Sequence, residues 1–163
     1  LIKGIAPKMN WELGPYHDPD RTFVLAPCTR ENLLLSRAAI ARAPRIPGWF
    51  FEAAKPAKVL DHLTFTACGA SVTADQWRYR LTSHNCGEFV DIELFYDEAT
   101  APPADHAGLF CELVVEALLG EAMRLERVDS IETCLVDDPG VVENTTAIRY
   151  LREHLAEVLA QRH

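Results

Sequence analysis

The sequence predicts an α+β domain, with a mostly antiparallel sheet and helices packed on one face. Two alternating segments, 76–83 and 88–97, predict a β-hairpin, and segments with helical spacing lie at 31–42, 106–119 and 145–161. The expected order of elements is β-β-α-β-β-β-β-α-β-β-α. This order lacks the regular β-α alternation of a doubly wound fold, so we expect hairpins rather than an all-parallel sheet.

The predicted hairpin at 76–97 has one register that satisfies both of its faces. Apolar side chains alternate along each strand and would meet on the inner face. The expected inner pairs are Trp77–Leu94, Tyr79–Ile92 and Leu81–Val90. The same register places opposite charges across from each other on the outer face. The expected outer pairs are Arg78–Glu93 and Arg80–Asp91. The outer face should therefore be polar and half exposed.

The segment 43–56, APRIPGWFFEAAKP, connects a helix to a strand. The helix at 31–42 begins after Thr29, which suits an N-cap, and it should stop before Pro44. After a Pro-Gly turn, the strand at 49–55 carries aromatic residues on both faces. Because such a strand must be covered on both sides, we expect it to be central in its sheet.

The remaining elements follow from the same spacing rules. The buried stripe of the first helix should hold Leu34, Leu35, Ala38, Ala39 and Ala43, and Leu33 and Ile40 should widen it. Strands are expected at 9–13 and 22–26, as a hairpin with a long loop, and at 63–67, 123–127 and 130–136. A turn is expected at 73–76, and Gly120 should end the helix at 106–119.

Length, composition and charge suggest one ordinary globular domain spanning residues 1–163. No apolar run approaches the 18 or so residues of a membrane span, so we expect no membrane association. The net charge of −8 argues against nucleic-acid binding, which needs a clustered basic surface. The chain begins at Leu1 rather than Met, so we expect a missing N-terminal segment.

The cysteines indicate a reducing compartment. Their number is odd, and no pair has the CxxC spacing typical of zinc ligands. The five are Cys28, Cys68, Cys86, Cys111 and Cys134. We therefore expect free thiols and a cytoplasmic protein.

Two segments of the chain carry a resemblance to known proteins. The segment 43–56 (APRIPGWFFEAAKP) and the segment 109–132 (LFCELVVEALLGEAMRLERVDSIE) resemble those of a loose family of uncharacterised bacterial α+β proteins. In the second segment a helix ends in Leu-Gly-Glu and a strand follows. The resemblance implies a small cytoplasmic α+β domain, and it assigns no catalytic residues.

The sequence favours a non-catalytic, protein-binding domain over an enzyme. It contains no P-loop, GxSxG, HExxH or dinucleotide fingerprint, and we expect no catalytic residue, cofactor or metal. The polar face of the sheet is the candidate docking surface for a protein partner, with tryptophans as anchors. The candidate binding residues are Trp11, Glu12, Trp49, Glu52, Arg78, Arg80, Asp91 and Glu93. The chain should be a monomer or a homodimer.

The alternative is a small hydrolase or a small-molecule-binding protein that uses scattered Glu and His residues. His84 and Cys86 lie two apart at the hairpin tip, but a metal site would need a third ligand. The candidates for that ligand are His17, His62 and Asp18. This alternative predicts a pocket with converging carboxylates or a metal, involving His84 or His62.

Overall fold

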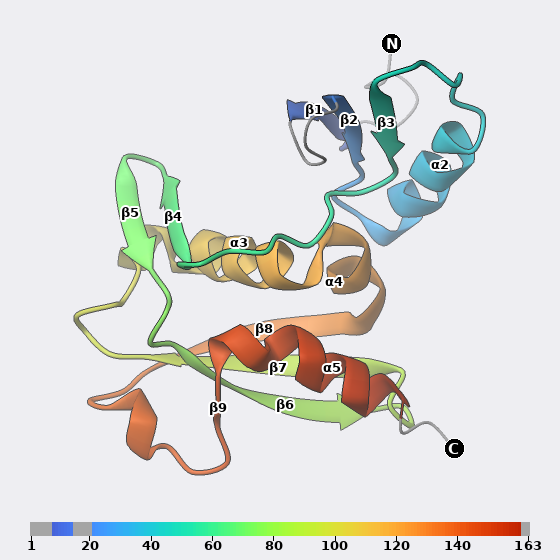
Figure 1. The fold of residues 1–163 in the computed structure, drawn as a ribbon. Helices are drawn as coiled ribbons and strands as arrows, with labels where there is room; N and C mark the ends of the chain where they lie inside the picture. Colours follow the sequence, from blue (N-terminus) through green and yellow to red (C-terminus); the bar gives the residue numbers. More distant parts are fainter. Residues whose placement is uncertain (1–7, 15–20, 161–163) are drawn as a thin grey trace. The chain divides into compact units, whose positions relative to one another are not determined.

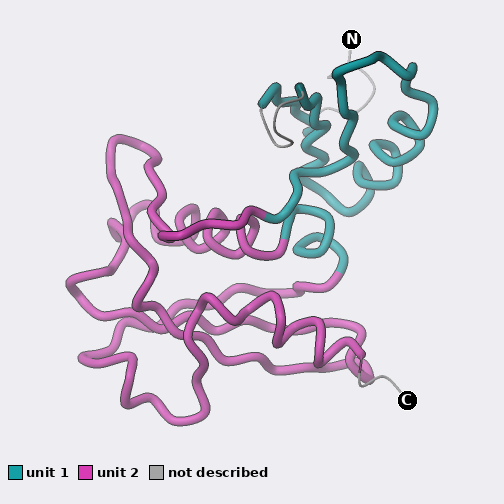
Figure 2. Tube along the Cα trace, viewed as in Figure 1, with its two compact units in different colours: residues 1–57, 120–126 teal, residues 58–119, 127–163 magenta. Residues whose placement is uncertain are grey.

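A computed structural model describes residues 8–14 and 21–160 and confirms the α+β class. Four of the six strand pairs in this part of the chain are antiparallel. The contacts divide the chain into two compact units (Figure 2). Unit 1 comprises residues 1–57 and 120–126, and unit 2 comprises residues 58–119 and 127–163.

Unit 2 contains a four-stranded sheet with two helices on one of its faces (Figure 1). The strand order is β8-β7-β6-β9, with β7 antiparallel to β6 and parallel to β8. The strands are β6 (Arg78–His84), β7 (Phe89–Tyr96), β8 (Val128–Leu135) and β9 (Thr146–Ala147), and the helices are α3 (Ala107–Leu119) and α5 (Leu151–Ala160). Short 3-10 helices, η1 (Ala104–His106), η2 (Pro139–Val141) and η3 (Ile148–Tyr150), lie in the connections.

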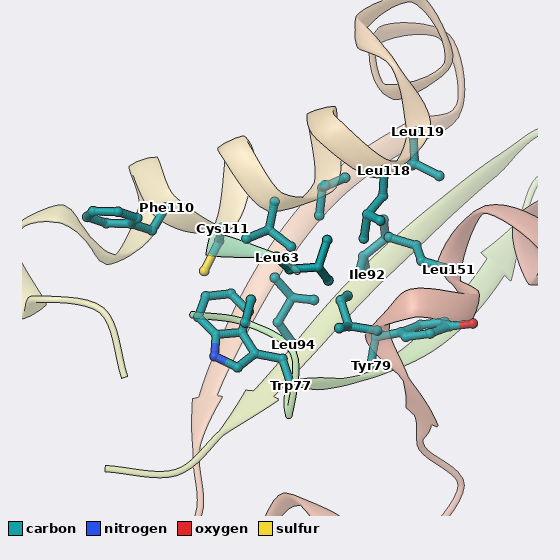
Figure 3. Packing of buried hydrophobic residues seen from close by; sticks show 14 of the residues in the cluster. Leu63, Trp77, Tyr79, Ile92, Leu94, Phe110, Cys111, Leu118, Leu119 and Leu151 are labelled. Atoms are coloured by element: carbon teal, nitrogen blue, oxygen red, sulfur yellow. The ribbon is translucent and has the colours of Figure 1, made fainter. Parts of the chain in front are cut away.

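The core of unit 2 lies between this sheet and the helices. Trp77, Tyr79, Ile92 and Leu94 are fully buried, and they point from the sheet toward α3 and α5 (Figure 3). The predicted assignment of the inner and outer faces of β6 and β7 is therefore confirmed. Burial of such large side chains contributes roughly 1.5–3 kcal/mol each, so this layer is the main source of stability in unit 2.

The register of the β6–β7 hairpin differs from the prediction by two residues. Leu81 lies opposite Ile92 rather than Val90, and Arg80 lies opposite Glu93 rather than Asp91. Arg78 accordingly faces Phe95 instead of Glu93. The position of the tip explains the shift, because residues 85–87 adopt positive φ and the four-residue loop runs from 85 to 88, with His84 and Phe89 as the last pair. A two-residue shift leaves every side chain on its predicted face.

A second hairpin in unit 2 was only half predicted. The strand expected at 63–67 is β4 (Thr64–Ala67), and it pairs with β5 (Ala70–Thr73), which the sequence did not reveal. Cys68 and Gly69 connect them with φ of 51° and 77°. Positive φ at both central residues suits the twist of a tight hairpin, but Cys-Gly is a weak signal for it. The turn expected at 73–76 does follow β5.

Unit 1 contains a three-stranded sheet of order β1-β2-β3, formed by β1 (Asn10–Gly14), β2 (Arg21–Ala26) and β3 (Trp49–Glu52). The predicted β1–β2 pairing is confirmed, while the hairpin loop lies outside the described residues. The prediction that the strand after Gly48 is central was wrong. β3 is an edge strand, parallel to β2, because the intervening helix returns the chain in the same direction.

Helix α2 (Arg30–Ile40) has the predicted N-cap but ends two residues before the expected position 42, and its buried face is shifted from the predicted one. Thr29 is the N-cap, and its side chain accepts the N–H of Asn32 at 3.2 Å. The centre of the expected stripe, from Leu34 to Ala39, has its apolar residues exposed instead, with Leu34 at 68%, whereas Leu33 at its edge is buried as predicted. The buried face holds Leu33 and Ser36, because the Ser36 hydroxyl donates to the carbonyl of Ala53. A pattern of apolar residues cannot predict the burial of a polar side chain that hydrogen-bonds to the backbone of another segment.

The expected strand at 123–127 is a helix, α4 (Glu121–Arg127). Gly120 ends α3 as predicted, with φ of +80°, and a new helix starts at once. Leu125 of α4 is buried against Leu33 and Ala54 of unit 1. The last helix also starts later than expected, since β9 and η3 occupy residues 146–150. Among the described residues, no helix has the length and apolar character that crossing a membrane requires.

Candidate functional site

A pocket of about 600 Å³ lies within unit 2. Its walls come from the extended segment 58–63, from the connection between β5 and β6, and from the start of η3 and α5. The volume falls in the range of roughly 300–1,000 Å³ that is usual for small-molecule sites. Segments that are distant in the sequence therefore form one concave surface.

The floor of the pocket is apolar. Leu63, Trp77 and Leu118 line it and are themselves buried in the core of unit 2. The indole N–H of Trp77 donates to the carbonyl of Thr100 at 3.2 Å, so this ring is fixed in place. A rigid apolar floor suits the hydrophobic body of a small ligand.

The rim of the pocket is charged, and some of its charges have partners within the protein. Arg78 donates to the hydroxyl and the carbonyl of Thr145, at 2.8 and 2.6 Å. By contrast, no described residue forms a side-chain hydrogen bond or ion pair with Lys58 or Arg152. The Arg149 guanidinium lies over the Tyr150 ring, 5.3 Å from its centroid. Lys58, Arg149 and Arg152 thus remain accessible to a bound anion.

A histidine–carboxylate pair stands at one side of the pocket. The Oδ1 atom of Asp75 accepts the N–H of Leu63 at 2.8 Å, and its Oδ2 atom lies 3.1 Å from Nδ1 of His62. The backbone bond fixes the carboxylate, which in turn orients the imidazole. The His62 side chain is 81% exposed, so the pair lies at the mouth of the pocket.

The open face of the sheet in unit 2 carries half of the predicted docking residues. Arg78, Arg80, Asp91 and Glu93 share this face, and Arg80 forms an ion pair of 2.9 Å with Glu93. The Arg80 guanidinium also lies over the Phe95 ring, at 5.1 Å. The prediction of a polar, partly exposed face therefore holds for this sheet.

The other four predicted docking residues lie in the separate sheet of unit 1. Trp11 and Glu12 are on β1, and Trp49 and Glu52 are on β3. Trp11 is 55% exposed and stacks on Phe23 with a centroid distance of 6.1 Å. Glu12 lies 3.4 Å from the ammonium of Lys55. The expectation that all eight residues share one sheet was wrong, because β1–β3 and β6–β9 form different sheets.

The first of the predicted metal ligands, His84, lies beside Asp91, which was not among the expected ligands. Its Nε2 atom is 3.5 Å from Oδ2 of Asp91. Cys86 is exposed in the hairpin turn, and His62 pairs with Asp75 at the pocket. His17 and Asp18 lie outside the described residues. Among the described members of that candidate set, His62 and His84 therefore each lie beside an aspartate, and only His84 belongs to a cluster of three ligand atoms.

Glu121 is a buried carboxylate at the start of α4. Its Oε1 atom accepts the N–H of Cys28 at 2.9 Å, and its Oε2 atom accepts the N–H of Lys55 at 3.1 Å. These bonds hold the loop before α2 and the segment after β3 to the start of α4. With both oxygens bound to backbone, this carboxylate has a structural role in unit 1.

Sequence reasoning missed the pocket because it needs three distant segments at once. The one local signal was the pair Arg149 and Arg152, which lie three apart at the start of the last helical segment and therefore share a face. Lys58 stands in a segment without regular structure, where no spacing rule applies. Comparisons with protein-family models, with curated proteins and with solved structures find no match for this chain.

Proposed function

We propose that the protein is a small-molecule-binding protein, and that the pocket of unit 2 takes a small organic anion. The observation that carries this proposal is a hollow with an apolar floor and three accessible cations, Lys58, Arg149 and Arg152, at its rim. The ligand class is a carboxylate or phosphate ester with a compact apolar body. Trp77 and Leu118 would contact the body, and the cations would contact the charged group.

The charge pattern supports an anionic ligand over a cationic one. The chain as a whole has a net charge of −8, yet four basic and three acidic side chains line this pocket. Of the acids, Asp75 is already bonded to Leu63 and His62. Asp61 and Glu153 then face three accessible cations, which favours binding of negative charge.

The test is a binding titration with defined probes. Phenyl phosphate and benzoate are the anionic probes, and benzyl alcohol and benzylamine are matched neutral and cationic controls. We expect saturable binding of an anionic probe and at least tenfold weaker binding in the Lys58→Glu and Arg152→Glu variants. Arg45→Glu, an exposed charge reversal in unit 1, is the matched control and should bind normally. Equal binding of the amine, or equal loss in the Arg45→Glu variant, would contradict the proposal.

A second candidate function is docking of a basic protein segment on the open sheet face of unit 2. The observation that favours it is the charge of that face, where Arg80 pairs with Glu93, while Glu132, the neighbour of Glu93 on β8, has no ion pair with any described residue. The test is NMR titration with a lysine-rich peptide and an acidic control peptide. Binding should shift the amide signals of β7 and β8, and Glu132→Lys should weaken it. Unchanged spectra with the basic peptide would remove this candidate.

We propose a cytoplasmic location for this binding protein. All five cysteines are free thiols, and Cys28, Cys68 and Cys86 are exposed. Exposed thiols persist in reducing compartments and tend to oxidise elsewhere. Fractionation of cells that express the full-length gene would test the location, and recovery outside the cytoplasm would contradict it.

A further inference from the structure

We infer that His84, Asp91 and Asp129 form a binding site for a divalent transition-metal ion on the outer face of the sheet in unit 2. One ligand atom from each of these side chains lies within 4.8 Å of the other two. The set combines one imidazole nitrogen with two carboxylate oxygens. This site lies on other residues than the pocket and does not depend on the proposed function.

The fold brings the three residues together from three adjacent strands. His84 ends β6, Asp91 lies on β7, and Asp129 lies near the start of β8. The parallel ladder between β7 and β8 pairs Val90 with Val128 but Asp91 with Ser130, so Asp129 is an extra residue at a register shift. A bulge of this kind redirects a side chain relative to regular alternation. The Asp129 carboxylate therefore lies near the side chains of His84 and Asp91, instead of on the face that regular strand alternation would give it.

The imidazole of His84 supplies the second, independent observation. Its Nε2 atom is buried and has no hydrogen-bond partner among the described residues, although Oδ2 of Asp91 is only 3.5 Å away. Buried polar nitrogens are almost always bonded, and an exception requires an explanation. A metal ion bound to the Nε2 lone pair and to the two carboxylates would satisfy this atom.

Neighbouring groups already orient the ligands. The Ser130 hydroxyl donates to Oδ1 of Asp91 at 2.6 Å, which leaves Oδ2 directed toward His84. The Phe89 ring lies beside the imidazole, with a centroid distance of 6.1 Å. Hydrogen bonds to a ligating carboxylate and apolar shielding of the site are the outer-shell features that strengthen metal binding.

The donor set indicates the metal class. Imidazole suits zinc, copper, iron and nickel, whereas magnesium and calcium prefer oxygen-only sites. Tetrahedral zinc at about 2.0–2.1 Å from its ligands places donor atoms roughly 3.3 Å apart. The Asp129 side chain is exposed and is free to rotate inward to reach that spacing. Three protein ligands leave a fourth position for water, so Zn²⁺ is the first probe.

The experiment uses the tag-free full chain, stripped with a chelator and kept reduced. Calorimetric titration with Zn²⁺ should show one saturable site, and Mg²⁺ should bind at least tenfold more weakly. We expect at least a tenfold loss of Zn²⁺ affinity in Asp129→Asn and in His84→Gln, and about a tenfold loss in Ser130→Ala. Glu132→Gln and Cys86→Ser are the matched controls and should bind normally.

Two results would overturn the inference. One is unchanged Zn²⁺ affinity in Asp129→Asn, an exposed substitution that is not expected to impair folding. The other is loss of binding in Cys86→Ser, which would assign the metal to the exposed thiols. The Co²⁺-substituted chain provides an independent readout, since its spectrum should lack a thiolate charge-transfer band.

Discussion

The carboxylate of Glu121 accepts the backbone N–H of Cys28 at 2.9 Å, across 93 residues of sequence. Its second oxygen accepts the N–H of Lys55, and its own N–H donates to the Lys55 carbonyl at 2.9 Å. One side chain therefore connects three segments of unit 1. The energetic consequence is large, because a buried carboxylate that satisfies two backbone donors leaves both unsatisfied when it is removed.

The substitution Glu121→Gln should destabilise unit 1 by about 2–4 kcal/mol. The amide has a single acceptor oxygen, so one of the two backbone N–H groups would lose its acceptor and face the N–H groups of the amide instead. Urea unfolding followed by tryptophan fluorescence measures the loss. Hydrogen exchange should accelerate at the amides of Cys28 and Lys55. Glu143→Gln, on the surface of unit 2, is the control and should change stability by less than about 0.5 kcal/mol. Unchanged exchange at Cys28 would contradict the assigned role.

Gly120 should tolerate alanine less well than Gly69 does. Both glycines have positive φ, at 80° and 77°, so a side chain is strained at either position. A Cβ atom at Gly120 would lie 2.9 Å from the backbone nitrogen of Ala57, whereas nothing lies within 4 Å of one at Gly69. We expect a cost of about 1 kcal/mol for Gly69→Ala and about 2 kcal/mol or more for Gly120→Ala. Urea unfolding measures the stability of both variants. An equal loss of stability in Gly69→Ala and Gly120→Ala would contradict this prediction.

Alternation and capping predicted much of the fold because these signals are local. The inner residues Trp77 and Ile92 were assigned correctly, since strand period alone decides which face a residue occupies. The register was two residues off, because it depends on where the loop begins, and the Asn85 and Gly87 that favour positive φ are compatible with a loop at 84–87 or at 85–88.

The larger misses were tertiary. Leu34 was expected to be buried and is exposed, whereas Ser36, which was not part of the expected stripe, is buried and donates to the Ala53 carbonyl. A strand was expected at 123–127, whereas this segment belongs to helix α4, whose first residue, Glu121, bonds to backbone from elsewhere in unit 1. No window of local sequence contains those partners. The pocket and the His84 cluster were missed for the same reason, although His84 itself was noted as a ligand.

Stability should fall in alkaline solution because two buried acids must ionise. Burial raises the pKa of Tyr79 to about 12, from an ordinary value of 10. Burial likewise raises the pKa of the Cys111 thiol to about 12, from 9. The unfolded chain loses these protons first, so the free energy of unfolding declines as pH rises above about 9 for Cys111 and about 10 for Tyr79. The stabilisation is complete below those values.

Urea unfolding between pH 8 and 11 measures this decline. Each group contributes up to about 1.4 kcal/mol per pH unit between its unfolded and folded pKa values. Tyr79→Phe should flatten the profile above pH 10, and Cys111→Ala should flatten it from pH 9. Parallel profiles for the wild-type chain and both variants would contradict the burial of these two groups.

The most direct test of the central claim is to map a bound anion onto the pocket of unit 2. In an NMR titration with phenyl phosphate, the amide signals of Lys58 and Arg152 and the indole signals of Trp77 should shift together and saturate. The indole signals of Trp11 and Trp49, which lie in unit 1, should not move. Shifts confined to unit 1, or equal shifts with benzylamine, would contradict an anion-binding pocket formed by Lys58, Trp77 and Arg152.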